Sequence, residues 1–549
     1  MIFLETIFFF MFLCFLSMSL AGFGKVITHK FKNSFFENIF IGFVILGFLI
    51  TLSHFFLTIS FFLSFLILCF GFLLFLLNKE KTLENIFIKK NIFYFLIIIF
   101  LTPIFLSQKY HEDFGYYHLP YVIALIEEKI IFGLANSNNA YIYNSIWLNL
   151  MSIFVLPGKN FNFLTLPVFL LYIIFIIFLL RNILETQKNV VSNYFAIVSL
   201  FYFILKFTRI SEFGTDLPAT LFSILSIFYF LKFSEVKNWN TKSYYFFCNF
   251  IFGIFAILIK LSCIPLLLLT SHMFISNYDK IKNEIFKFNY IFIYFLCSLF
   301  FIQQFFYTGC FIFPSTLTCL EVSWFSNDFL LLKNNLELIN KSYAEAQNIY
   351  SKEDYLNNFT WLSYWFERNY IEIIEHIVTM IFPLILLIFL FKKDNKNSNF
   401  IFANKKFFLF FIIFSFIFWL NFSPVYRFAV HYFISFIFVI TLFFYKKKVF
   451  SLNIFVVLIV ISLIFNFSKN VSRILKKDNI YFGIEMMKNE FIDITLSKGN
   501  ISIYKPNISK NNKNGWQGRL CWDIPFMCSY NKINVDKNYG YLFFSKLNN

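Results

Sequence analysis

Charged side chains are scarce in this chain, and acidic ones are scarcer than basic ones. Only 14% of the 549 residues are charged, with 30 Asp and Glu against 47 Lys and Arg. Hydrophobic residues make up 59%, Phe alone occupies 91 positions, and the mean hydropathy is +0.69. A soluble globular domain does not carry that much apolar surface, whereas repeated apolar runs near ~20 residues are typical of chains that cross a membrane many times. The composition therefore predicts a multi-pass membrane protein.

The nine cysteines lack the paired spacing of a zinc site. Cys248, Cys263 and Cys297 fall in apolar runs and are expected to be core residues. Two other pairs lie in polar segments and can form disulfides if those segments are extracytoplasmic. These pairs are Cys310 with Cys319, and Cys521 with Cys528.

The N-terminal apolar run, residues 1–22, lacks the basic region of a secretory signal and carries Glu5. It therefore indicates a first membrane span and not a cleaved signal. The net charge of +17 does not indicate nucleic-acid binding, because most lysines lie in short clusters between apolar runs. That distribution orients helices in a bilayer and fits anionic lipid.

Apolar runs and lysine clusters together predict about fourteen spans, with both termini outside. The predicted spans are residues 1–22, 36–53, 57–77, 91–107, 161–180, 194–207, 217–233, a hairpin within 244–275, then 289–306, 377–391, 407–420, 429–445 and 449–467. Two segments with weaker apolar character, 121–131 and 144–156, are expected to be interfacial helices along the outer membrane face.

These spans predict an all-α multi-pass transmembrane fold followed by a small extracytoplasmic α/β domain. Residues 1–90 form an N-terminal three-helix segment, 91–467 the transmembrane core and 468–549 the C-terminal domain. A strand is expected at 501–505. Three external loops belong to the core: 108–160, 208–216 and 307–376.

The first external loop contains an unusual polar stretch, residues 111–118, with the sequence HEDFGYYH. It holds the adjacent acids Glu112 and Asp113 where a predicted span emerges into water. The second external loop carries Glu212 and Asp216 on the same side of the membrane. The predicted topology adds two cations to this face, Lys260 and Arg427.

An enzyme on this face has no ATP or nucleotide sugar, so a lipid-linked, pre-activated donor is the natural substrate. Asp113 would take the proton of an acceptor in an in-line displacement. Lys260 and Arg427 would hold the lipid phosphate that leaves. Alternatively, carboxylates from the two loops would bind a divalent cation, Mg²⁺ or Mn²⁺, beside that phosphate.

Each assignment has a structural alternative. An acid pair at a helix exit is often a solvated cap, and Asp216 before Leu-Pro favours a helix start. Lys260 can reach the membrane interface along its own aliphatic stem. Arg427 can serve as an ion-pair partner, and His118 as a packed interfacial residue.

The chain resembles the GT-C-type membrane glycosyltransferases, the superfamily of the protein mannosyltransferases and the lipid A aminoarabinose transferase, and within it a bacterial branch of integral membrane proteins. The residues that carry the resemblance are DFGYYH at 113–118, NSIW at 144–147, TDLP at 215–218, IKLS at 259–262, GCFIFPST at 309–316, PVYRF at 424–428 and CWD at 521–523. They extend from residue 91 to the C-terminus, so only the first three predicted spans lie outside the resemblance.

The resemblance implies a polyprenyl-phosphate-linked sugar donor, inversion at the sugar carbon, and a location in the bacterial inner membrane with the active site facing outward. The base would be Asp113, with Glu112 as its alternative, and the acid of the next loop would be Glu212 or Asp216. Tyr117 and His118 would position the substrate. The chain departs from the pattern where a Val replaces the acid expected before Tyr426-Arg427.

The predicted function is therefore transfer of a sugar from a polyprenyl-phosphate carrier to a glycan, lipid or protein acceptor. Two alternatives are a flippase for lipid-linked oligosaccharide and a polysaccharide polymerase-like assembly protein. A flippase should place charges along a central path, whereas here they gather on one face. A polymerase favours arginines and histidines in its large external loop, and residues 307–376 offer only Arg368 and His376, near the far end.

Overall fold

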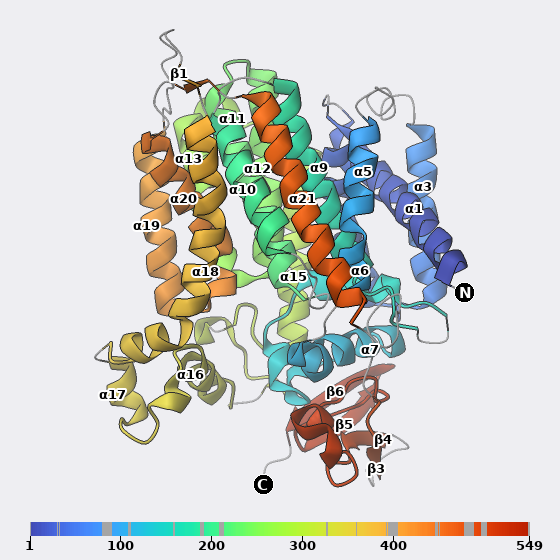
Figure 1. The fold of residues 1–549 in the computed structure, drawn as a ribbon. Coiled ribbons are helices and arrows are strands. Elements are labelled where there is room, and N and C mark those ends of the chain that lie inside the picture. Colours follow the sequence, from blue (N-terminus) through green and yellow to red (C-terminus); the bar gives the residue numbers. More distant parts are fainter. Residues whose placement is uncertain are drawn as a thin grey trace.

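The structure is a computed structural model that describes residues 2–29, 31, 33–78, 91–107, 111–157, 160–186, 191–207, 214–313, 315–325, 328–357, 359–390, 392–393, 404–444, 448–449, 451–476, 488–495 and 502–546. Long helices stand side by side and form the body of the molecule (Figure 1). Their bounds are α1 (Ile2–Thr28), α2 (Phe35–His54), α3 (Phe61–Leu77), α5 (Asn91–Leu101), α6 (Pro103–Leu106), α9 (Leu166–Thr186), α10 (Val191–Lys206), α11 (Asp216–Glu235), α12 (Trp239–Ile259), α13 (Leu266–Ser276), α15 (Phe288–Thr308), α18 (Trp361–Leu390), α19 (Lys405–Phe422), α20 (Val430–Phe444) and α21 (Leu452–Ile474).

Nine helices in the described part of the chain are long and apolar enough to cross a membrane. Five further apolar helices are shorter than the usual spanning length. Within a bilayer a helix satisfies its own backbone hydrogen bonds, which explains why the apolar runs fold this way. The prediction of a mostly helical, multi-pass membrane protein is confirmed. Of the predicted cytoplasmic lysine clusters, those at 79–90, 187–190, 394–403 and 445–447 lie at positions outside the described residues.

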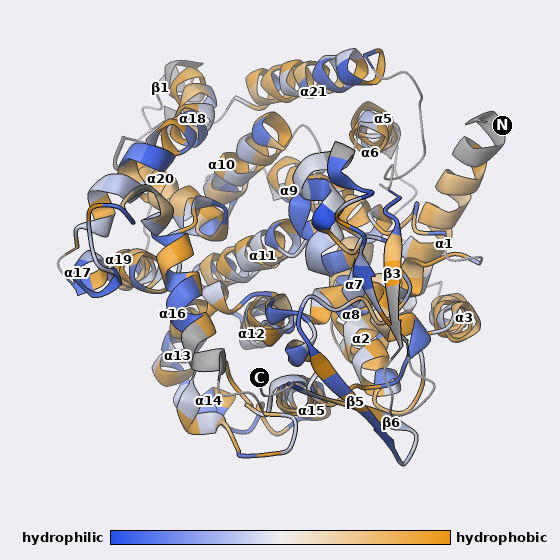
Figure 2. Ribbon diagram, turned by 90° about the horizontal axis from the view of Figure 1, so that it is seen from below, coloured by the Kyte–Doolittle hydropathy of each residue, from blue (hydrophilic) through white to orange (hydrophobic). Residues whose placement is uncertain are grey.

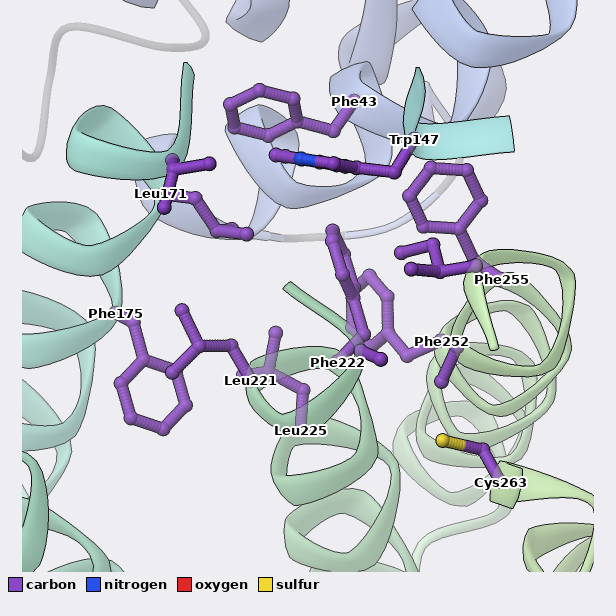
Figure 3. Packing of buried hydrophobic residues seen from close by; sticks show 14 of the residues in the cluster. Phe43, Trp147, Leu171, Phe175, Leu221, Phe222, Leu225, Phe252, Phe255 and Cys263 are labelled. Carbon is purple, nitrogen blue, oxygen red and sulfur yellow. The ribbon is translucent and has the colours of Figure 1, made fainter. Parts of the chain in front are cut away.

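The helices pack around a core of large apolar side chains. Figure 3 shows Trp147 of α8 (Ile146–Met151) beside Phe43 of α2, with their ring centroids 5.7 Å apart. Below them Phe222 of α11 meets Phe255 of α12 edge to face at 4.8 Å. α1 and α2 approach closely, since a Cβ on Gly42 would overlap the carbonyl oxygen of Leu20. Small residues permit such contacts between membrane helices.

Two helix ends differ from the predicted spans. The first span was expected to end before Lys25, but α1 continues to Thr28, and the buried Lys25 ammonium donates to Asn33 Oδ1 at 2.9 Å. The predicted span 377–391 is the second half of a longer helix, because α18 begins at Trp361. Hydropathy alone misses this earlier start, since residues 361–376 carry charges yet keep a helical backbone. The large external loop is therefore shorter than the predicted 307–376.

Short helices connect the long ones: α7 (Leu119–Glu127), α8, α14 (Tyr278–Ile281), α16 (Asp328–Asn340) and α17 (Lys352–Asn357). Helices do form within both segments predicted to be interfacial. However, most of α7 and all of α8 are buried, and α7 lies between the bundle and the C-terminal strands (Figure 1). They are thus covered by protein and do not lie freely along the membrane face.

The described C-terminal residues form two antiparallel hairpins and one 3₁₀ helix, so the predicted α/β domain is instead a small β domain there. Strand β3 (Phe491–Thr495) pairs with β4 (Ser502–Pro506), and β5 (Ile533–Asn538) pairs with β6 (Tyr541–Lys546). The backbone of Phe132 exchanges hydrogen bonds with Leu542 and Phe544, which docks β6 onto the segment after α7. Seen from below, β5 and β6 lie on the side of α2 and α15, away from α18 and α21 (Figure 2).

A two-residue ladder between β1 (Lys392–Lys393) and β2 (Lys448–Val449) lies at the opposite end of the bundle from the β domain (Figure 1). The lysines of this ladder and the predicted external loops are thus separated by the length of the helices.

Candidate functional site

A cavity of about 970 Å³ lies beside α10, at the end of the bundle that carries the predicted external loops. Its walls come from the first external loop, α10, the start of α11, α18, the turn before α20, and α21. The titratable residues that line it are His111, Asp113, Tyr117, His118, Lys206, Asp216, Lys260, Glu372, Glu375, His376, Arg427, Lys469 and Arg473.

The first external loop presents Asp113 to this cavity. Asp113 immediately precedes a short π-helix, Phe114–His118, which leads directly into α7. Phe114, Gly115 and His118 are buried, so the π-helix is anchored in protein. The Asp113 carboxylate lies 3.4 Å from His111 Nδ1 and 3.5 Å from a terminal nitrogen of Arg427.

Arg427 joins the two predicted acidic loops. Its Nε lies 2.9 Å from one carboxylate oxygen of Asp216, while its Nη2 faces Asp113. Asp216 is the first residue of α11, where a negative charge is favourable beside the helix dipole. A planar guanidinium with several donors can contact two carboxylates at once, which a lysine ammonium does less well.

Lys260 lies at the break between α12 and α13, as expected for the tip of the predicted hairpin. Its ammonium is ion-paired with the second carboxylate oxygen of Asp216 and lies 3.2 Å from the centroid of the Phe428 ring. Only 19% of its side chain is exposed, so this charge needs both contacts to offset its desolvation. The Tyr432 hydroxyl donates to the carbonyl of Ser262 at 2.8 Å and fixes the turn.

The surroundings of Asp113 and His118 lower the pKa of both side chains. Burial opposes ionisation of Asp113, but the hydrogen bond with His111 and the nearby positive charges outweigh it and lower the pKa to about 2. For His118, burial dominates over the nearby carboxylates and lowers the pKa to about 4. At neutral pH the cavity therefore holds an ionised Asp113 and a neutral His118.

The structure thus brings together Asp113, Asp216, Lys260 and Arg427, and His118 and Tyr117 line the same cavity. Glu112, the alternative base, is exposed and does not line it. Glu212 lies outside the described residues.

A second group of polar side chains, which the sequence does not predict as part of the site, also lines the cavity. Lys206 at the end of α10 pairs with Glu375 of α18 at 2.8 Å, and the Tyr202 hydroxyl lies 2.7 Å from His376 Nδ1. Lys469 and Arg473 of α21 complete this group. The sequence does contain one indication that Lys206 belongs to the site, because Lys206 lies just before the second acidic loop. The residues from α18 and α21 lie outside the predicted spans, in the predicted external loop 307–376 and the predicted C-terminal domain.

Much of the rest of the cavity wall is apolar. Phe382 and Leu386 of α18 and Ile461 and Phe465 of α21 contribute to this apolar wall. Phe382, Ile461 and Phe465 are exposed, so the apolar wall continues onto the outer surface of the bundle. From Glu372 to Leu386 the cavity follows α18 for about 20 Å at 1.5 Å per residue. Its shape suits a ligand with a polar head and a long apolar chain.

Among the residues that the structure describes, no group of three or more His, Cys, Asp or Glu side chains is arranged to hold a metal ion. Lys260 and Arg427 neutralise Asp216, and Arg427 also faces Asp113. The alternative of a divalent cation held by carboxylates from both loops would require these cations to move aside.

Both cysteine pairs singled out in the polar segments are closed as disulfides. Cys310–Cys319 closes a loop just after α15, and Cys521–Cys528 closes a loop of the β domain. Both lie at the same end of the molecule as the cavity.

A family model described as "Domain of unknown function (DUF8201)" matches residues 1–434. No curated protein and no solved structure matches the chain. Asp113, Asp216, Lys260 and Arg427 all lie within the matched segment, whereas the β domain lies beyond it.

Proposed function

The chain belongs to the DUF8201 family, and we propose that it is a membrane glycosyltransferase that uses a polyprenyl-phosphate-linked sugar. One observation carries the proposal. A single cavity combines carboxylates from two loops, bridged by Arg427, with an apolar wall that reaches the outside of the helix bundle. A lipid-linked sugar has matching parts: a polar reacting centre, a phosphate and a long apolar chain.

In the proposed reaction an acceptor hydroxyl or amine attacks the anomeric carbon of the sugar. The new bond to that carbon forms as its bond to the phosphate oxygen breaks, and polyprenyl phosphate leaves with the bonding electrons. Asp113 accepts the proton of the acceptor, and the configuration at the sugar carbon inverts. Its low pKa ensures that it is ionised, but it also makes it a weak base in the empty site.

Arg427 can relieve that weakness. Its side chain lines the cavity and is 46% exposed, so a ligand in the cavity can reach it. When a lipid phosphate draws the guanidinium toward itself, Asp113 loses a positive neighbour and its pKa rises. The base would thus strengthen as the donor binds. Lys260 is already paired with Asp216 and would keep that carboxylate fixed while supporting the phosphate charge.

The apolar wall between α18 and α21 would admit the lipid chain from the side. We further propose that the nine long and five shorter apolar helices form fourteen spans in a bacterial inner membrane, and that those after residue 90 make up a GT-C-like core. The cavity would then face the extracytoplasmic side, where a lipid carrier replaces nucleotide sugars. A flippase is the weaker candidate, because the charged groups of the cavity gather near one end of the helices.

The deciding experiment is the Asp113→Asn variant, assayed for release of polyprenyl phosphate from a panel of synthetic polyprenyl-phosphate hexoses, with host membranes supplying the acceptor. Asparagine keeps the size of the side chain but accepts no proton, so we expect transfer to fall by at least about 10³-fold. Expression and membrane insertion should match the wild type. The matched control is Glu112→Gln, which changes the neighbouring exposed acid and should retain transfer.

Full activity of Asp113→Asn would refute the mechanism. Loss of activity in Glu112→Gln alone would move the base to Glu112, against its position outside the cavity wall.

A further inference from the structure

The disulfide loop of the β domain packs directly against the first external loop. Trp522, one residue inside Cys521–Cys528, donates its backbone N–H to the carbonyl of Gly115 at 3.0 Å. Its ring meets Phe114 edge to face, with centroids 5.8 Å apart. Trp522 is fully buried, although it belongs to a domain more than four hundred residues further along the chain.

Gly115 is fitted to this contact. A Cβ placed on Gly115 would lie about 2.5 Å from the indole ring of Trp522, a distance that real side chains do not tolerate. The indole N–H donates to the carbonyl of Gln517 at 3.1 Å, so the ring is oriented by its own domain. The absence of a side chain at Gly115 therefore lets a rigid ring support the π-helix from beneath.

A second contact joins the same two loops. The hydroxyl of Tyr530 accepts the backbone N–H of Cys521 at 2.8 Å and lies 3.5 Å from the carbonyl of Tyr116. The rings of Tyr530 and Tyr116 are 5.1 Å apart. Trp522 within the disulfide loop and Tyr530 just beyond it thus contact consecutive residues of the first external loop.

We propose that the disulfide loop Cys521–Cys528 fixes the geometry of the cavity, with Trp522 as the positioning residue for Asp113. The carboxylate contacts of Asp113 with His111 and Arg427 measure 3.4 and 3.5 Å, longer than a well-formed hydrogen bond. Such contacts hold a side chain weakly, so the position of the carboxylate depends on its backbone. That backbone enters the π-helix two residues before Gly115, where Trp522 supports it.

This inference rests on the proposed function only where it gives Asp113 a catalytic role. The mechanical part, support of the first external loop by the β domain, stands on the contacts alone. It also gives the β domain, which lies beyond the segment matched by the family model, a part in the site. Because the support depends on the disulfide, the cavity geometry should depend on oxidation of Cys521 and Cys528.

The test measures hydrogen–deuterium exchange by mass spectrometry on the full-length protein in detergent, following residues 111–120. Trp522→Ala should speed exchange in this segment about tenfold or more, and Trp522→Phe, which keeps a flat ring, should restore most of the protection. The matched control is Trp516→Ala, because Trp516 is an exposed tryptophan of the same domain. It should leave the segment unchanged.

The disulfide is tested separately with the double variant Cys521→Ser/Cys528→Ser, matched by Cys310→Ser/Cys319→Ser. Only the first double variant should speed exchange in residues 111–120, while exchange in α11 and α12 stays at the wild-type level in both. This pair keeps the test informative if Trp522→Ala fails to fold.

Transfer assays add a readout that a merely structural role would not give. We expect kcat of Trp522→Ala to fall at least about tenfold with KM for the donor unchanged, because a displaced base slows the chemical step. Unchanged exchange in residues 111–120 of both Trp522→Ala and the Cys521/Cys528 variant would overturn the proposal. If the variants speed exchange in residues 111–120 but the wild-type protein transfers no sugar, the proposed function is refuted. The inference that the β domain supports the first external loop would still stand.

Discussion

At the scale of single residues, Arg427 is the position on which the two acidic loops converge. The sequence predicts it as a phosphate ligand because the predicted topology places this cation on the same face as the acidic loops. In the structure it already contacts Asp113 and Asp216. No periodicity or spacing encodes that bridge, since it depends on how α11 and the turn before α20 approach one another. The bridge holds the guanidinium in the cavity, where it can bind an anion. It also reduces the repulsion between the two carboxylates.

The candidate residues that the sequence revealed are those that break an apolar pattern. Asp113, Asp216 and Lys260 are conspicuous because each interrupts or ends a long hydrophobic run. Lys206 and Glu375 were missed, because one closes a helix and the other lies within a polar stretch that continues a helix. Their pairing across the cavity depends on the contact between α10 and α18, which only the fold determines.

His118 makes stability depend on pH. Burial lowers its pKa to about 4 from an ordinary value of 6.5, so between these values the unfolded chain binds a proton that the folded chain does not. The stabilisation is complete above about pH 6.5 and is lost as the pH falls toward about 4. The full effect is of the order of 3 kcal/mol. We expect His118→Gln to show a weaker fall in Tm than the wild type between pH 7 and pH 4.5, measured by differential scanning fluorimetry in detergent.

The other histidines are the same in both proteins, so the difference between the two Tm profiles isolates His118. Parallel profiles would contradict the assignment of a neutral, buried His118.

At the scale of elements, hydropathy located the spans better than it located their ends. The break between α12 and α13 was predictable, since Lys260 and Pro265 interrupt one long apolar block. The start of α18 was not, because a helix can continue beyond the apolar layer once its exposed side chains are polar. That extension carries Glu375 and His376 to the cavity, so the missed helix end and the missed site residues share one cause.

The wall formed by α18 and α21 can be tested by filling it. Ser462 of α21 is buried and lines the cavity, so Ser462→Trp would place an indole in the path proposed for the lipid chain. We expect KM for a long-chain polyprenyl donor to rise at least about tenfold, with a smaller rise for a donor truncated to a few isoprene units. The measurement is steady-state release of the lipid phosphate.

Ile464→Trp is the matched control, because Ile464 lies on the same helix, is exposed, and does not line the cavity. It should leave KM unchanged for both donors. Equal effects of the two substitutions would show that the lipid chain does not use this wall.

At the scale of the whole molecule, two features support the proposed orientation in the membrane. Lysine-rich segments such as β1 and β2 lie at the end opposite the cavity, and cytoplasmic loops are the ones enriched in lysine. Both disulfides lie at the cavity end, and disulfides persist on the oxidising side. The positions of the lysines in the sequence are enough to predict which loops lie on the same side. Only the fold shows that the disulfides, the acidic loops and the β domain lie at one end of the molecule.

This orientation predicts the labelling of single introduced cysteines by a membrane-impermeant maleimide. Ser509 is exposed in the β domain, and Lys237 is exposed between α11 and α12. Ser509→Cys should react in intact spheroplasts, whereas Lys237→Cys should react at least about tenfold less until the membrane is opened by detergent. The wild-type chain gives the background, since its described free cysteines all lie in apolar helices.

The reverse pattern would place the cavity in the cytoplasm, where nucleotide sugars are present and disulfides are reduced. The case for a lipid-linked donor would then be lost, because it depends on a cavity that nucleotide sugars cannot reach.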